Sequence, residues 1–222
     1  MTNCQIGVFA AYVSARGHAF VDRALYLPRN WTTDPLPLAA AHVPESTAFA
    51  TKPTLAVKMI VRALTTDMPF AWVAADAVYG VGDIEQVLRR AGKPVLSLPK
   101  GGNVLGVKGD HRFGSWGDKP VVAGTAAQIA SDLDPGAWHR LSAGNGTKGA
   151  RLHDRAYLEL VDLEADEYAA DLSGIRTRGL LIRRHVADGD LAFFTTWCPA
   201  GTTMETLVRV EGHRWAEPAR FR

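Results

Sequence analysis

Asp76 is the residue whose type and place best suit chemistry. It follows an apolar run over 70–75 that contains no alternating polar residue, and it precedes Tyr79-Gly80. Such a run is typical of a buried β-strand, and ligands of open α/β sheets bind at the ends of strands. A buried carboxylate costs free energy unless a cation or hydrogen bonds compensate it. Asp76 is therefore a candidate catalytic or cation-binding residue, and the alternative is a cap on the following turn.

Positively charged residues cluster around one later strand. The cluster comprises Arg176, Arg178, Arg183 and Arg184. Contact with nucleic-acid phosphates is one interpretation, and a solvated edge strand protected by charge is the other. Because side chains alternate along a strand, Arg183 and Arg184 point to opposite faces, so only part of the group can form one patch.

Three weaker patterns favour structural roles. Residues 144–149 have the spacing of a dinucleotide-binding glycine loop, but no strand precedes them and no helix follows, so a turn is expected. Cys198 and His185 could be interpreted as a catalytic nucleophile and its base. The apolar residues next to the cysteine favour core packing instead. A nuclease could draw its acids from one strand, whose alternation would split them between two faces. Those acids are Asp154, Glu159 and Asp162.

Composition gives a background for these candidates. The 222 residues carry a formal net charge of +2, so no global basic field points to nucleic acid. Two cysteines without metal-ligand spacing, Cys4 and Cys198, fit a reducing cytoplasm. No apolar run reaches the roughly 18 residues of a membrane span, and no signal peptide is recognisable. We expect a soluble cytoplasmic protein without a membrane partner.

The elements that position Asp76 follow the order strand, strand, helix, strand, helix. They are expected over 4–13, 18–27, from Thr51 to about 64, over 70–75 and over 83–91, with a proline-broken loop over 28–50. Ser14 to Gly17 has the length of a hairpin turn, and Thr51 with Pro53 suits a helix start. This order predicts a mixed α/β sheet with Asp76 at its edge.

The second half of the chain has a different texture. A short helix is expected over 126–133, strands over 150–162, 177–186 and 191–197, and a final helix over 202–215. We expect the strand-rich residues 108–195 to project from the α/β core as an insertion.

Several stretches in chain order resemble insertion-sequence transposases of the DDE superfamily. They are residues 3–9, 16–19, 22–28, 50–53, 72–80, 178–184 and 210–215. The resemblance implies an α/β fold with a ribonuclease H-like mixed-sheet core, incomplete here, that is interrupted by a strand-rich insertion. The implied division is a core over 1–107, an insertion over 108–200 and the start of a C-terminal core helix over 201–222.

The resemblance also implies a chemistry. Two divalent cations, Mg²⁺ or Mn²⁺, are held by an Asp-Asp-Glu triad and cleave and transfer DNA strands at transposon ends. Asp76 matches the second acid of the triad and is the implied metal ligand. Arg183, Arg184, His213 and Arg214 are the implied DNA-binding residues.

The other two acids depart from the family pattern. The first belongs on a strand before Cys4, and Asp22 matches a different, non-catalytic position. In the third motif Arg214 fits, but Pro218 stands where Glu is expected, and Glu217 lies one position early. A slip of one residue turns a helical side chain by about 100°.

The expected protein is thus a transposase-derived fragment, truncated at both ends and catalytically defective. A non-catalytic DNA-binding or inert remnant is the alternative. Residues 94–103 form an extra stretch relative to the family and are expected at the periphery. If the protein binds DNA, it is expected with the nucleoid.

Overall fold

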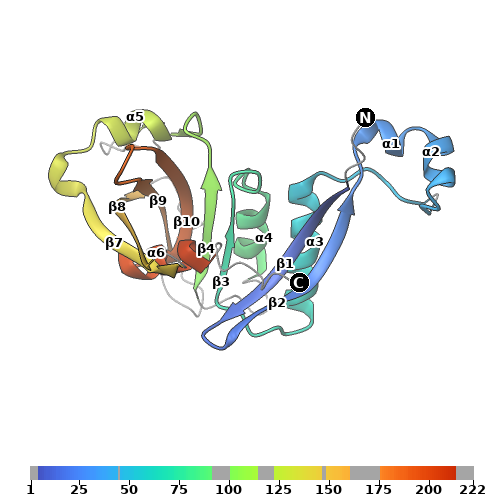
Figure 1. Ribbon diagram of the computed structural model, residues 1–222, viewed down its shortest axis with the longest axis horizontal. Coiled ribbons are helices and arrows are strands. Elements are labelled where there is room, and N and C mark those ends of the chain that lie inside the picture. Colours follow the sequence, from blue (N-terminus) through green and yellow to red (C-terminus); the bar gives the residue numbers. More distant parts are fainter. Residues whose placement is uncertain are drawn as a thin grey trace.

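A six-stranded mixed sheet organises the computed structural model, which describes residues 5–44, 46–91, 101–114, 123–146, 149–160 and 176–213. The strand order is β3-β4-β10-β9-β8-β7, and the curved sheet is seen in Figure 1. Its strands are β3 (Trp72–Ala75), β4 (Gly102–Val107), β7 (His139–Gly146), β8 (Gly149–Leu160), β9 (Arg176–Arg184) and β10 (Leu191–Pro199). Only β3 and β4 are parallel, and the other pairs are antiparallel.

Alternation along the strands separates two apolar layers. On one face α6 (Met204–His213) packs Leu207 and Val208 against Val104, Leu181 and Phe194. The other face is covered by α4 (Asp83–Ala91) at the β3 end and by α5 (Ala126–Ser131) farther along. The sheet therefore lies between helices, and its central strands are buried on both sides.

A β-hairpin and a helix form the other part of the molecule. The hairpin consists of β1 (Ile6–Ser14) and β2 (Gly17–Tyr26), which pair only with each other among the described residues. The helix is α3 (Lys52–Thr65), which lies beside the hairpin in Figure 1. As predicted, Thr51 caps α3, and its Oγ1 accepts from the Thr54 amide at 3.2 Å.

The expectation of an unstructured loop over 28–50 is wrong in part. Two short helices occur there, α1 (Arg29–Thr32) and α2 (Pro35–Ala40). Pro35 lies at the start of α2, where a helix has no amide partner to lose, and Asp34 accepts from the Leu36 amide. Proline therefore begins a helix here instead of breaking it.

The expectation that residues 108–195 project from the core is also wrong. Strand β10 pairs with β4 through the register Phe193↔Val107 to Trp197↔Asn103, so the second half of the chain continues the sheet that contains β3. The physical reason is burial: every residue of β4 is buried, so the backbone groups at its second edge need a neighbouring strand as hydrogen-bond partner. The division into 1–107, 108–200 and 201–222 stays a prediction.

Three local features differ from the sequence expectations. Strand β7 was not predicted, and Gly144 to Gly146 belong to it where a turn was expected, while Gly149 begins β8; residues 147 and 148 lie outside the described residues. Strand β9 lies inside the sheet, between β10 and β8, so its arginines do not guard an edge. Gly102 and Asn103, the end of the stretch 94–103, are buried in β4; residues 94–100 lie outside the described residues.

The remaining elements are small. Strands β5 (Arg112–Phe113) and β6 (Gly124–Thr125) pair beside α5, and a 3₁₀ turn covers Pro135–Ala137. No helix within the described ranges is long and apolar enough to cross a membrane. The predicted α/β class with a mixed sheet is confirmed.

Candidate catalytic site at the end of strand β3

Asp76 lies directly after β3, at an edge of the sheet as predicted. Its Oδ1 accepts from the Val78 amide at 3.1 Å, and its carbonyl accepts from the Tyr79 amide at 3.0 Å. The residue is exposed, so its carboxylate has solvent access as well as the turn contact. Asp76 therefore caps the turn through its Oδ1 atom.

Close backbone packing fixes this turn on β4. A Cβ atom added to Gly106 would lie 2.7 Å from the Ala77 nitrogen and 2.8 Å from the Asp76 carbonyl carbon. A Cβ atom added to Gly80 would lie still closer to the Gly106 carbonyl oxygen. Only glycine leaves room here, so Gly106 sets the position of the Asp76 backbone. Sequence reasoning missed this role, although glycine in a strand signals close approach of another backbone.

The pKa of Tyr79 is shifted by its surroundings in the site. Partial burial raises the pKa of its phenol, and the negative charge of Asp76 raises it further. The phenol therefore stays neutral at physiological pH and can donate a hydrogen bond but not act as an anion.

A groove of about 990 Å³ opens beside Asp76. Asp76 and Tyr79 line it together with β1, β3, one side of α3 and one side of α6. The lining of α6 includes Arg209 and His213, both exposed. The candidate acid Asp76 thus lies in the wall of a concave surface.

Asp22 does not contribute to this groove. Its Oδ2 accepts from Arg62 Nε at 2.8 Å and Nη2 at 2.7 Å, which joins β2 to α3. Asp22 is absent from the groove lining. Its place agrees with the expectation that it has no catalytic role.

The two implied DNA-binding arginines of β9 point to opposite faces, as alternation predicts. Arg183 Nη1 donates to Glu211 at 2.9 Å, on the α6 side. Arg184 donates to Asp154 at 3.2 Å and stacks over Trp138 at 4.1 Å. His213 lies at the end of α6, and Arg214 and Glu217 lie outside the described residues. The structure does not bring Arg183, Arg184 and Asp76 together in one cluster.

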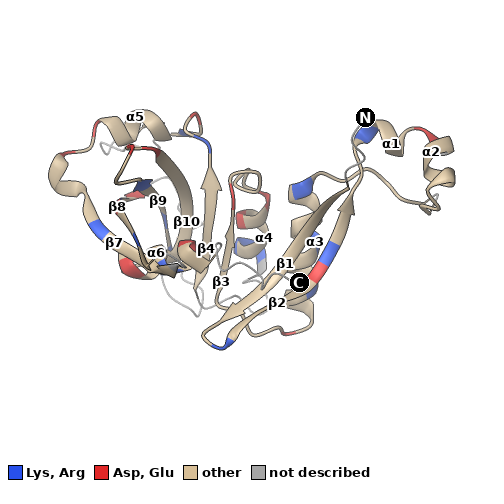
Figure 2. Ribbon diagram, in the orientation of Figure 1, with Lys and Arg blue, Asp and Glu red and all other residues tan. Residues whose placement is uncertain are grey.

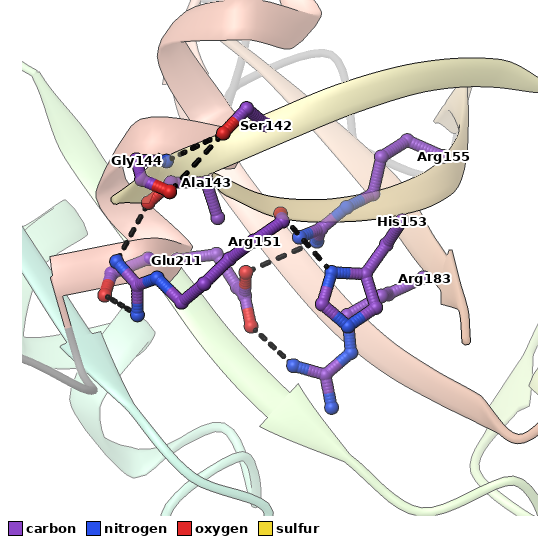
Figure 3. Close-up of polar contacts among 9 residues, drawn as sticks. Ser142, Ala143, Gly144, Arg151, His153, Arg155, Arg183 and Glu211 are labelled. Atoms are coloured by element: carbon purple, nitrogen blue, oxygen red, sulfur yellow. Dashed lines mark hydrogen bonds and ion pairs between the residues drawn. The ribbon is translucent and has the colours of Figure 1, made fainter. Parts of the chain in front are cut away.

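A buried ionic network anchors α6, and sequence reasoning missed it. Glu211 lies between Arg155 Nη1 at 3.0 Å and Arg183 Nη1 at 2.9 Å, as Figure 3 shows. Arg155 is 0 % exposed and Glu211 1 %. Burial lowers the pKa of the Arg155 guanidinium, and Glu211 opposes this shift. The spacing of Leu207, Val208 and Glu211 on one helix face was the available signal.

Arg151 closes the end of the same helix. Its guanidinium donates to the Gly212 carbonyl at 3.1 Å and to the Ala143 carbonyl at 2.7 Å (Figure 3). The last carbonyls of a helix lack partners within it, and a cation there also complements the helix dipole. Arg151 therefore holds α6 against β7.

The other candidates do not assemble into sites. Cys198 is buried near the far end of β10 from His185, and burial raises the pKa of its thiol, as expected for core packing. Asp154 is bonded by Arg140 and Arg184, which lower its pKa. Glu159 lies near the other end of β8, and Asp162 is outside the described residues.

A pair of divalent cations requires several carboxylates that converge on one site. Within the described ranges no three His, Cys, Asp or Glu side chains lie close enough to hold a metal ion. Among the described residues, Asp76 is the single carboxylate in the groove lining. Mg²⁺ gives up its water reluctantly and is bound weakly by one carboxylate. The described side chains therefore do not fit a two-metal centre.

A scan against protein-family models gave one match. The family described as DDE superfamily endonuclease matches residues 1–142, which include β3 and Asp76. This chain belongs to the DDE superfamily endonucleases. The six-stranded mixed α/β sheet is consistent with their ribonuclease H-like domain. Searches of curated proteins and of solved structures gave no match. The family acts on DNA and depends on divalent metal ions. Its match to residues 1–142 confirms the predicted relation to DDE transposases.

Proposed function

We propose that this chain is a transposase-derived protein of an insertion sequence that does not by itself cleave or join DNA. Membership of the DDE endonucleases supports the ancestry, whose reaction is strand cleavage and transfer at transposon ends. The observation that carries the proposal is that Asp76 is the one carboxylate that the described part of the chain contributes to the groove lining.

The physical argument concerns charge. Two cations in one site repel each other and are held by several convergent carboxylates, which also fix their positions against the attacking and leaving oxygens. Asp76 supplies one such group, with one oxygen engaged by the Val78 amide. Glu217 lies outside the described residues and one position from the family motif. Pro218→Glu alone is not expected to create activity, because it would add one carboxylate to Asp76 where two cations require several.

The test is a nicking assay with the purified chain. Supercoiled plasmid and linear DNA carrying the element's own ends are incubated with Mg²⁺ or Mn²⁺, with Asp76→Ala as the matched variant. We expect no metal-dependent nicking from either protein. Nicking by the natural chain that disappears in Asp76→Ala would overturn the proposal.

A DNA-binding role without catalysis is the second candidate. Arg140 and Arg184 share the carboxylate of Asp154, yet their side chains remain 55 % and 39 % exposed. Two cations facing one carboxylate leave an excess positive charge for a phosphate.

Gel-shift titration against salt tests this role. Arg140→Ala together with Arg184→Ala should weaken binding and reduce the salt dependence, whereas Arg16→Ala at the hairpin tip should not. Absence of any binding at low salt would leave the inert remnant as the interpretation.

A further inference from the structure

Two histidine rings lie side by side at one end of β8 and β9. His153 and His185 come directly beyond the register pair Asp154↔Arg184, so they face each other across the two antiparallel chains. Their ring centroids are 5.5 Å apart. Because side chains alternate along a strand, both rings lie on the sheet face that α6 covers, opposite to Asp154 and Arg184. Strand pairing therefore holds the two imidazoles close together.

The contacts of each ring determine which nitrogen carries the proton. His185 Nδ1 lies 2.7 Å from the Asp188 carboxylate, and His153 Nδ1 lies 3.3 Å from the Arg151 carbonyl (Figure 3). An ionised carboxylate and a carbonyl accept hydrogen bonds but do not donate them, so each Nδ1 is the donor. In the neutral rings Nε2 then has a lone pair, and neither Nε2 has a hydrogen-bond partner in the described part of the chain.

This pattern is typical of histidines that bind metal ions. A metal-binding imidazole usually donates its other ring N–H to a carboxylate or a backbone carbonyl, which fixes the ring and makes the ligating nitrogen more basic. His185 has the first kind of acceptor and His153 the second.

The distance between the rings also fits a shared ion. With Zn–N bonds of about 2.0–2.1 Å and a tetrahedral angle, two imidazoles on one Zn²⁺ have centroids roughly 5 Å apart. The observed separation of 5.5 Å is close to this value. The side chain of His185 is 47 % exposed, so an ion can reach the pair from solvent.

The charges around the pair are partly balanced. Arg155 and Arg183 share this face of the sheet and would repel a cation, but Glu211 forms an ion pair with both. Burial, followed by the charge of Arg155, lowers the pKa of His153 and favours the neutral ring, which is the form that binds metal. Asp188 places a negative charge beside the other ring.

We propose that His153 and His185 together bind one divalent transition-metal ion of the class of Zn²⁺. Imidazole suits Zn²⁺, Cu²⁺ and Ni²⁺, whereas Mg²⁺ prefers oxygen ligands. Within the described ranges no three metal-binding side chains form a cluster, so water completes the coordination. The ion links β8 to the end of β9 on the α6 face. This site is separate from Asp76, which follows β3 at the sheet edge remote from β8.

Calorimetric titration of the tag-free chain with zinc chloride at pH 7.5 tests the site. We expect one ion per chain. His153→Ala or His185→Ala should weaken binding at least about tenfold, because losing a ligand costs no less than losing the contact that orients it. Asp76→Ala and His42→Asn are the matched controls and should bind zinc as the natural chain does. His42 is exposed and has a φ of 55°, which asparagine also adopts.

Thermal unfolding gives the effect on stability. An ion that binds the folded chain at 100 times its Kd should raise Tm by roughly 5–10 °C. The double variant His153→Ala/His185→Ala should show no such rise, and Mg²⁺ at the same concentration should not raise the Tm of the natural chain. An equal rise with zinc in the double variant would overturn the proposal.

Nuclear magnetic resonance of ¹⁵N-labelled histidines identifies the ligating atoms in the natural chain. Zinc should shift the Nε2 resonances of His153 and His185 together, while each Nδ1 stays protonated. Asp188→Asn should weaken the affinity about 10–100-fold, because it removes the carboxylate that orients one ring. A shift of one ring alone, loss of binding in Asp76→Ala, or no binding of zinc would each overturn the proposal.

Discussion

The sheet around α6 buries even charged side chains, whereas the hairpin formed by β1 and β2 leaves large apolar side chains exposed. On the α6 side, Arg155 and Glu211 are enclosed at 0 % and 1 % exposure, and each central strand has two neighbours. On the hairpin side, Phe9 and Phe20 are 57 % and 52 % exposed, their rings 5.4 Å apart, and β1 and β2 have no further strand neighbour within the described ranges. In Figure 2 the hairpin carries few charges apart from Asp22, Arg23 and the tip. The candidate acid Asp76 belongs to the sheet side, where it follows the edge strand β3.

The largest effect should come from breaking the buried network. Glu211→Ala leaves the Arg155 guanidinium buried without its carboxylate, and loss of one partner of a buried pair costs about 3–5 kcal/mol. Urea denaturation measures the free energy of unfolding. Glu205→Ala, exposed on the same helix, should change it by less than about 0.5 kcal/mol. Equal values for both variants would show that the network does not stabilise the sheet.

A smaller loss is expected at the edge of the sheet, where the turn after β3 packs on β4. Gly106→Ala adds a methyl group against the backbone of Asp76 and Ala77, which cannot move as freely as a side chain. Overpacking of this kind typically costs about 1–3 kcal/mol. Thermal unfolding followed by circular dichroism provides the comparison with Gly136→Ala, where a Cβ meets no atom within 4 Å. A stable Gly106→Ala protein would mean that the turn is not fixed on β4.

The exposed ion pair of the hairpin should contribute much less than the buried one. Arg62 and Asp22 are 2.7 Å apart, with side chains 54 % and 25 % exposed. Exposed pairs contribute roughly 0.2–1 kcal/mol, and salt should reduce this further. A double-mutant cycle with Arg62→Ala and Asp22→Ala at low and high salt measures the coupling. A coupling as large as that of Arg155 and Glu211 would contradict the contrast between the regions.

The smallest effect concerns pH. Burial, followed by the charge of Arg155, lowers the pKa of His153 below its ordinary value of 6.5. Between the lowered and the ordinary pKa the unfolded chain binds more protons, so stability is present above pH 6.5 and falls as the solution is acidified through this window. His153→Gln should flatten the dependence of unfolding free energy on pH between 7.5 and 5.5. An unchanged slope would show that His153 is not its source.

The sequence predicted the elements well where patterns are local. Thr51, Pro53 and the apolar spacing placed α3, and the short turn before Gly17 placed the hairpin. It failed at β7, whose residues are mixed in polarity because the strand lies at an edge of the sheet. It also could not place β10 beside β4, because that pairing joins residues far apart and depends on which edge remains open.

The candidate site was predictable only in part. Asp76 was found from its place after an apolar run and does follow β3, but the strand is half-buried and Asp76 is exposed, where a buried strand and a buried carboxylate were expected. Arg183 was assigned to DNA by the arginine cluster and the family resemblance, but its partner Glu211 is on a helix 28 residues later. Whether a cation faces solvent or a buried carboxylate is decided by packing between distant elements, which a pattern along one strand does not contain.

The order of strands in the sheet has a consequence for how the protein folds during synthesis. Thr195 on β10 donates to the Leu105 carbonyl on β4, across 90 residues of chain. When β4 leaves the ribosome, its eventual neighbour has not yet been translated, and its apolar faces remain uncovered until most of the chain has emerged. Long-range pairings of this kind form slowly because a large loop must close first. A nascent chain stalled before residue 191 should therefore be the form most susceptible to aggregation and most dependent on chaperones.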